Sequence, residues 1–246
     1  MSRVSVVTGG TKGIGLAVAR RLSRAGGRVY LTYWNDESAA TEARSACEAA
    51  GADVVLLRAD AADPRFGDTV VAAVRDNDSR IDVAVHCAVR GAGGKTVSIS
   101  PEEWITHVQA NGLSFILLVR ALDPLLESGS SVFFLTSAGA RDVVRNYAPI
   151  GIPKALAEAG ARYLAAELAP RGIRVNAISP GAMDTAAFRS VFPDPEPVLQ
   201  AVVKATPARR LATPDDVAAV IEWLSGQDGS MLVGDRIDVD GGAHLY

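Results

Sequence analysis

The sequence predicts an α/β fold, with one doubly wound domain built on a seven-stranded parallel sheet that carries helices on both faces. Short apolar segments rich in Val, Ile and Leu alternate with longer helical segments along the 246 residues. A glycine-rich turn joins the first apolar segment to the first helix. The length and the 48% hydrophobic content suit a single domain over residues 1–246.

The predicted elements follow from composition and period. Strands are expected in the segments rich in β-branched and apolar residues, at 3–8, 28–33, 53–59, 81–86, 131–135, 172–178 and 235–240. Helices are expected at 16–27, 37–50, 64–78, 101–126, 154–169 and 214–225, several of them closed by glycine or opened by a capping residue. Parallel strands place their carboxyl ends, where such folds bind ligands, at one edge.

Residues 186–206 lack a clear pattern. The segment contains Phe188, Phe192 and three prolines at positions 193, 195 and 197. Long connections with apolar patches often cover a binding site, so this segment is interpreted as a lid over a hydrophobic substrate.

Composition excludes several classes of protein. With 25 basic and 28 acidic residues the net charge is −3, and no block of like charge points to nucleic acid or to an anionic membrane surface. Apolar runs such as residues 113–119 are too short to cross a bilayer, and the first residues lack the layout of a signal peptide. Cys47 and Cys87 form no metal or redox spacing, which predicts a reduced cytoplasmic protein without a metal.

The glycine turn after the first strand predicts a dinucleotide site. Gly9, Gly13 and Gly15 let the backbone approach a pyrophosphate, and the following helix offers the partial positive charge of its N-terminus. The spacing is Gly-x-x-x-Gly-x-Gly, and Thr11, Lys12 and Ile14 complete the turn.

The end of the second strand bears on the choice of cofactor. An NAD site usually places an acidic residue there, whereas this chain has Tyr33, Trp34 and Asn35. Lys12 is placed to reach a 2′-phosphate, which favours NADPH. Asp36 and Glu37 favour NADH, which stays possible.

The segment from Thr136 to Lys154 carries the candidate chemistry. Tyr147 and Lys154 are seven residues apart, so they share one face if a single helix covers both. A nearby ammonium favours phenolate and is expected to lower the phenol pKa, and such a phenol can serve an oxygen that becomes negative during reaction. These residues alone fit a helix-start Tyr and a surface Lys equally well.

Two further polar residues stand in apolar surroundings. Asn111 lies inside the long helix predicted at 101–126, where it either pins a kink through backbone bonds or holds a catalytic water or Lys154. His86 ends a strand, and it is as compatible with packing as with a ligand contact. Asp60, after the third strand, is placed to accept from an adenine amine.

Taken together, these motifs resemble the short-chain dehydrogenase/reductase family. The matching positions span nearly the whole chain, from Gly9 through Asn111, Ser137 and Lys154 to Gly242. The resemblance implies that Tyr147, Lys154, Ser137 and Asn111 are catalytic. It also implies cofactor binding by Gly9, Thr11, Lys12, Gly13, Ile14, Gly15, Tyr33, Trp34, Asn35, Asp60, Ala61, Cys87, Ala88, Val89, Lys154, Pro180, Gly181, Met183 and Thr185.

The departures from the family pattern point to a subgroup. Most members place the catalytic Tyr four residues before Lys, a position that is Ile150 here. The longer Tyr147–Lys154 spacing, like Val85-His86-Cys87, resembles the enoyl-acyl-carrier-protein reductases. In enoyl reductases a second Tyr often takes the place of Ser137, so whether Thr136 or Ser137 faces the substrate is open. Pro153 lacks a donor and is expected to delay the start of the helix.

Three interpretations follow. The first is an NAD(P)H-dependent reductase of the C=C bond of an enoyl thioester or related conjugated carbonyl compound, free or bound to an acyl carrier. The second is a carbonyl reductase, or ketoreductase, with a relocated Tyr. The third is a non-catalytic nucleotide-binding protein. The resemblance, with the apolar faces of the helices of Trp104 and Leu156, also implies a homo-oligomer, a tetramer or a dimer.

Overall fold

The predicted seven-stranded parallel sheet is confirmed. Its strand order is β3-β2-β1-β4-β5-β6-β7, and each neighbouring pair is parallel. The computed structural model describes residues 2–91, 93–191 and 194–245. The strands are β1 (Val4–Thr8), β2 (Arg28–Tyr33), β3 (Asp53–Arg58), β4 (Ile81–His86), β5 (Leu126–Leu135), β6 (Arg174–Pro180) and β7 (Arg236–Val239).

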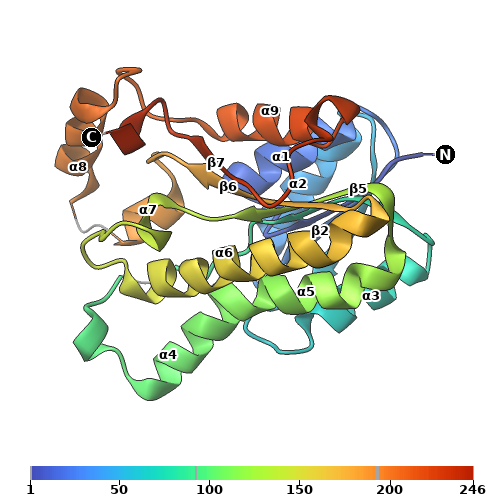
Figure 1. The fold of residues 1–246 in the computed structure, drawn as a ribbon, viewed down its shortest axis with the longest axis horizontal. Helices are drawn as coiled ribbons and strands as arrows, with labels where there is room; N and C mark the ends of the chain where they lie inside the picture. The colour runs from blue at the N-terminus through green and yellow to red at the C-terminus, as the bar shows by residue number, and fades with distance from the viewer. Residues whose placement is uncertain (1, 92, 192–193, 246) are drawn as a thin grey trace.

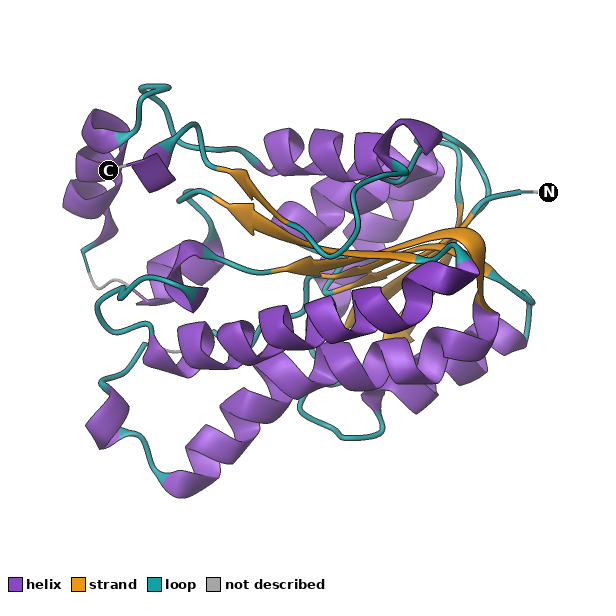
Figure 2. Cartoon of the chain, in the orientation of Figure 1, coloured by secondary structure: helices purple, strands orange, loops and turns teal. Residues whose placement is uncertain are grey.

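Helices cover both faces of the sheet, and Figure 2 shows the strands between two helical layers. One layer contains α1 (Gly13–Ser23), α2 (Glu37–Glu48) and α9 (Pro214–Leu224), and the other contains α3 (Phe66–Arg75), α5 (Ser114–Leu122) and α6 (Ala148–Leu168). The short helix α4 (Pro101–Val108) extends away from the sheet (Figure 1).

Two apolar cores lie on the two faces, because successive side chains of a strand point to opposite sides. Val4 and Val6 of β1 pack with Phe115 in the core beneath α3, α5 and α6. Val7 packs with Val18 and Ile221 in the core beneath α1 and α9. A strand buried on both faces reads as a continuous apolar run, which is why the strands were visible in the sequence.

Two boundaries differ from the predicted ones for physical reasons. β5 begins at Leu126, five residues before the predicted start. The prediction missed this first half because the segment is polar, contains Gly129 at φ 95° and shows no strand pattern. Helix α6 begins at Ala148, so the prediction that Pro153 delays the helix is wrong. Pro153 lies inside the helix, and the carbonyl left without its usual donor is satisfied from elsewhere, as described below.

The predicted long helix at 101–126 is a continuous but irregular helix. A π-helical turn at Gln109–Leu113 joins α4 to α5, and a short 3₁₀ turn at Asp123–Leu125 follows. Residues Pro101–Leu125 are long and apolar enough to cross a membrane by length and composition alone. Half of an apolar 18-residue part of that stretch is buried in the protein, and the stretch packs against α3 and α6, as expected of a core helix.

The proposed lid contains two helices rather than an unpatterned loop. These are α7 (Ala186–Val191) and α8 (Pro195–Ala205), which lie at the end of the sheet toward which the strand arrows point in Figure 1. Phe192 and Pro193 fall outside the described residues.

His86 is a packed strand-end histidine. Its Nε2 lies 2.9 Å from the Ser114 hydroxyl, and its ring meets Phe66, Phe115 and Phe134. Burial lowers the pKa of His86 to about 3, so the ring is neutral at physiological pH.

Candidate active site

The glycine turn between β1 and α1 is built by close backbone approaches. A Cβ on Gly15 would lie 2.2 Å from the carbonyl oxygen of Gly9, and a Cβ on Gly9 would lie 2.9 Å from the backbone nitrogen of Ala88. Gly9 and Gly13 have positive φ values of 60° and 51°. Glycine is therefore required at these positions by space and by conformation.

The residues of this turn fit the pyrophosphate of a dinucleotide. A Cβ on Gly13 would meet nothing within 4 Å, so the backbone there faces open space. Helix α1 begins at Gly13, and no side chain caps the amides of its first turn. Uncapped amides at a helix N-terminus are a ready site for a phosphate anion.

The structure gives Lys12 a partner that the sequence did not predict. Its ammonium forms an ion pair with Asp36, whose other carboxylate oxygen accepts from the Ala39 amide at the start of α2. Lys12 and the Ala39 amide together lower the pKa of Asp36. The positive charge assigned to the 2′-phosphate is therefore already compensated by a carboxylate held in place by a helix cap.

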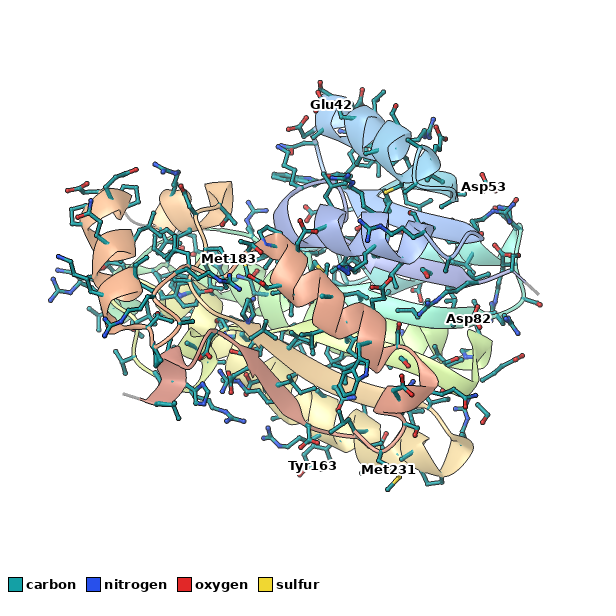
Figure 3. All side chains as sticks on the ribbon, turned by 90° about the horizontal axis from the view of Figure 1, so that it is seen from above. Glu42, Asp53, Asp82, Tyr163, Met183 and Met231 are labelled. Atoms are coloured by element: carbon teal, nitrogen blue, oxygen red, sulfur yellow. The ribbon has the colours of Figure 1, made fainter. Side chains whose placement is uncertain are left out.

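The other predicted cofactor residues lie where the fold places them, after the carboxyl ends of the strands. The Asp60 carboxylate, after β3, accepts from the Ala62 amide at 2.9 Å. Met183 is buried beyond β6 and is labelled in Figure 3, and Thr185 accepts from the Phe188 amide at the start of α7. The remaining ones are Ala61 after β3, Cys87, Ala88 and Val89 after β4, and Pro180 and Gly181 at the end of β6. In the described chain, no three metal-binding side chains gather.

Tyr147 is the residue that immediately precedes α6. Asn146 before it has φ 60°, a left-handed conformation that Asn tolerates better than most residues. The Tyr147 ring lies on the backbone of Gly139, where a Cβ would come within 2.4 Å of Cδ1. A Cβ on Gly151, four residues after Tyr147, would come within 2.3 Å of the Gly139 carbonyl oxygen. Two glycines thus fix the place of the phenol.

The phenol of Tyr147 is protonated in this state. Burial raises its pKa, and the nearby Ser137 hydroxyl opposes that shift without making a hydrogen bond of good geometry. The expected lowering of the phenol pKa by Lys154 is therefore not met. A buried, protonated phenol is suited to donate to an oxygen that gains negative charge.

Lys154 is buried and turned toward the end of β5. Its Nζ donates to the carbonyls of Leu135 at 2.8 Å and Thr136 at 3.2 Å. An ammonium has three N–H groups, so one is left by these bonds for a ligand. Burial lowers the pKa of Lys154 to about 8, and negative charge at Cys87 or Glu158 opposes the drop.

Ser137, and not Thr136, faces the candidate site. The Thr136 hydroxyl is occupied by its bond to Glu158 at 2.6 Å, whereas the buried Ser137 oxygen makes no hydrogen bond and lies near the Tyr147 phenol. Glu158 is a buried residue that the sequence reasoning missed. Its place one helical turn after Lys154 was the available signal.

Asn111 pins backbone groups and does not bond to Lys154. Its side-chain oxygen accepts from the Arg90 amide at 2.7 Å, and its nitrogen donates to the carbonyls of Arg90 and Pro149, each at 3.1 Å. Pro149 is four residues before Pro153, so its carbonyl lacks the usual helical donor. The amide of Asn111 replaces that donor, which explains how α6 continues through a proline.

Close packing places Asn111 for this role. A Cβ on Gly112 would lie 2.7 Å from the carbonyl oxygen of Pro153, so the π-helical turn touches α6 directly. The turn shifts the register of the helix and directs Asn111 toward α6. Asn111 is thus a positioning residue that ties the start of α6 to the loop after β4.

Glu158→Gln is expected to shift the pH dependence of activity. Lys154 is cationic below its pKa of about 8 and loses its charge above it, so a reaction that needs the ammonium slows as pH rises through that value. Burial raises the pKa of Cys87 to about 12, so the thiol is neutral there and Glu158 is the acting negative charge. Without that charge, the alkaline limb of kcat/KM moves to lower pH.

Asp238→Asn is the matched control for this shift. Glu158 pairs with Arg236 at 3.2 Å, and Asp238 pairs with the same arginine at 3.0 Å. Asp238, however, is not among the groups that act on Lys154. An alkaline limb that stays in place in Glu158→Gln, or moves equally in Asp238→Asn, would contradict the assignment.

Comparison with known proteins identifies the family. A family described as Enoyl-(Acyl carrier protein) reductase matches residues 9–244. The 3beta-hydroxysteroid dehydrogenase 1 of Eggerthella lenta is 33% identical over 98% of this chain and 93% of its own length. The 1-cyclohexenylcarbonyl-CoA reductase of Streptomyces collinus is 30% identical over 99% of this chain and 87% of its own.

A solved structure gives the same answer. A short chain dehydrogenase from Burkholderia cenocepacia in complex with NADP superposes with a TM-score of 0.90 and 28% identity, over 98% of both chains. The protein belongs to the short-chain dehydrogenase/reductase family. It is an NAD(P)-dependent oxidoreductase of that family.

Proposed function

We propose that the protein is an NADPH-dependent reductase of the C=C bond of an enoyl thioester or a related conjugated carbonyl compound. The place of Tyr147 carries this proposal. The residue four before Lys154 is Ile150, which is 3% exposed and has no proton to give. The only phenol of this segment lies one turn earlier, just before α6, on the backbone of Gly139.

The displacement of the phenol suits conjugate reduction. Carbonyl reduction delivers hydride to the carbon that bears the oxygen, so the acid must lie close to the hydride target. Conjugate reduction delivers hydride two carbons away, and negative charge develops on the distant enolate oxygen. A Tyr moved by three residues, nearly one helical turn, lies at a different distance from the hydride target and is proposed to meet that distant oxygen.

Each polar group of the site takes one role in this proposal. When bound, the reduced nicotinamide supplies a hydride. Tyr147 donates its hydrogen bond to the substrate carbonyl oxygen and stabilises the charge that develops there. The free N–H of Lys154 holds a ribose hydroxyl, and the unpaired Ser137 hydroxyl offers a second donor to the substrate. Helices α7 and α8, which lie at the carboxyl end of the sheet, are proposed to cover the site and to exclude water from it.

The relative from Streptomyces collinus supports this proposal, because its name describes reduction of a cyclohexenylcarbonyl thioester. A ketoreductase is the second candidate. It is favoured by the unpaired Ser137 hydroxyl and by the relative from Eggerthella lenta, which is named a hydroxysteroid dehydrogenase.

Steady-state NADPH oxidation with matched substrates tests the proposal. Crotonyl-CoA and a cyclic enone are compared with the saturated ketone and with acetoacetyl-CoA. We expect the conjugated substrates to be consumed with loss of the C=C bond, read by mass spectrometry of the product. Reduction of the ketones alone would replace this proposal by the ketoreductase one.

The cofactor and the compartment are parts of the same proposal. NADP is bound by the similar protein from Burkholderia cenocepacia, and no acid directly follows β2 here. NADH is the alternative cofactor, which Asp36 and Glu37 favour. The two free cysteines fit a reducing cytoplasm.

The protein is expected to assemble into a homotetramer or dimer. Helix α4 exposes Ile105 and helix α6 exposes Leu156 and Tyr163, which are seven residues apart on nearly one face. Met231 is exposed as well, and Tyr163 and Met231 are labelled in Figure 3. Multi-angle light scattering should return a multiple of 25.7 kDa, and Ile105→Glu should lower it. Val143→Glu, a change of an exposed apolar residue elsewhere, is the control. A mass of one chain at micromolar concentration contradicts the assembly.

A further inference from the structure

Two cations near the end of β2 are already paired. Lys12 forms its ion pair with Asp36. Arg58, at the end of β3, donates to the carbonyl of Trp34 at 3.2 Å and approaches Glu37 at 3.8 Å. Neither cation is free to give its full charge to a new anion.

Arg90 differs from both. Its guanidinium lies over the Trp34 ring, 5.2 Å from the ring centroid. In the part of the chain that the structure describes, no carboxylate forms an ion pair with it. The Trp34 side chain is 50% exposed, so this stacked pair stands at the surface of the cofactor edge.

The backbone of Arg90 is held although its side chain is exposed. The buried amide of Asn111 accepts from the Arg90 amide and donates to the Arg90 carbonyl, at 2.7 and 3.1 Å. The guanidinium is therefore presented from a fixed point, with its face placed on an indole.

The pair spans the turn that cradles the pyrophosphate. Trp34 follows β2 and Arg90 follows β4, and these strands lie on either side of β1 in the sheet. The contact between Arg90 and Trp34 therefore crosses the carboxyl end of β1, where the glycine turn begins. The adenosine ribose of a bound dinucleotide lies near the end of β2 in such folds.

We propose that Arg90, stacked on Trp34, is the residue that recognises the 2′-phosphate of NADPH, in place of Lys12. This rests on the NADPH preference in the proposed function. A stacked guanidinium uses only its face, so its N–H edge remains free for phosphate oxygens. That edge binds phosphate with two parallel hydrogen bonds, which an ammonium cannot do.

Binding of 2′,5′-ADP and 5′-AMP, followed by calorimetry, tests Arg90 without any reaction. The two probes differ only in the 2′-phosphate. Arg90→Gln is expected to weaken the binding of 2′,5′-ADP by about tenfold to a hundredfold, the usual contribution of hydrogen bonds to a charged group. Binding of 5′-AMP should stay within about twofold, since it lacks the group that Arg90 contacts.

Two variants sharpen the result. Arg58→Gln removes the same charge from a neighbouring but paired arginine, and it should leave the ratio of the two affinities nearly unchanged. Arg90→Lys keeps the charge but loses the planar fork, and it should fall between the wild type and Arg90→Gln.

The outcomes separate this inference from the proposal beneath it. A wild-type preference for 2′,5′-ADP that survives in Arg90→Gln overturns the role of Arg90 and leaves the NADPH preference standing. Equal losses in Arg90→Gln and Arg58→Gln also overturn it, because they show a general effect of charge. A wild type that binds both probes equally overturns the NADPH preference and, with it, the role of Arg90.

Discussion

Tyr147→Phe is expected to lower kcat for the conjugated substrate by about a hundredfold or more. One well-placed donor to a developing oxyanion contributes typically about 3 kcal/mol to the transition state. The ring itself stays packed on Gly139, so the change removes only the hydroxyl. NADPH affinity should be nearly unchanged, which fluorescence titration of the variant would check.

Lys154→Ala is the contrasting variant, because Lys154 is proposed to act both in catalysis and in cofactor binding. It should lower kcat and weaken NADPH binding together, since its ammonium donates to the end of β5 and is proposed to hold a ribose hydroxyl of the cofactor. Normal turnover in Tyr147→Phe, combined with an inactive Ser137→Ala, would contradict the assignment and transfer the role of the acid to Ser137.

Asn111→Ala is expected to destabilise the protein by about 3 kcal/mol, since buried polar groups without partners cost about 1–3 kcal/mol each. The variant leaves the amide and carbonyl of Arg90 and the carbonyl of Pro149 without the Asn111 side chain. Urea unfolding measures the change. Asn77→Ala, an exposed asparagine whose side chain reaches the Ala73 carbonyl at only 3.5 Å, is the matched control.

Pro153→Ala is expected to rescue part of this loss. Alanine restores the amide that can donate to the Pro149 carbonyl inside α6, so the double variant should recover about 1 kcal/mol relative to additivity. The double-mutant cycle isolates this one bond from the two bonds to Arg90. Strict additivity of the two changes would show that Asn111 does not act as the substitute donor.

The fold was predictable because its signals are local. Strands buried on both faces appear as apolar runs, and Gly26, Gly51 and Thr213 mark helix ends by their own chemistry. The first half of β5 was missed because a polar edge of a strand has no such signal. The start of α6 was misplaced because the donor that Pro153 lacks is supplied by Asn111, which lies far away in the sequence.

The candidate site was predictable in its residues but less so in its contacts. The glycine turn and the Tyr147–Lys154 pair were visible as patterns. Three features depend on burial and on contacts between distant segments, which the sequence does not show. They are the pairing of Lys12 with Asp36, the hydrogen bond from Thr136 to Glu158, and the raised pKa of Tyr147. Spacing along the chain contains no information on which of two adjacent hydroxyls turns inward.

Asp36 joins the charge of Lys12 to the integrity of a helix, and this restricts any redesign of the proposed cofactor preference. The same carboxylate pairs with Lys12 and caps α2 through the Ala39 amide. Asp36→Ala would release Lys12 for a phosphate, yet it would remove a cap whose loss typically destabilises a protein by about 1 kcal/mol. Asp36→Ser retains a capping oxygen while it removes the charge. It is therefore a better first substitution than Asp36→Ala for strengthening a preference for NADPH.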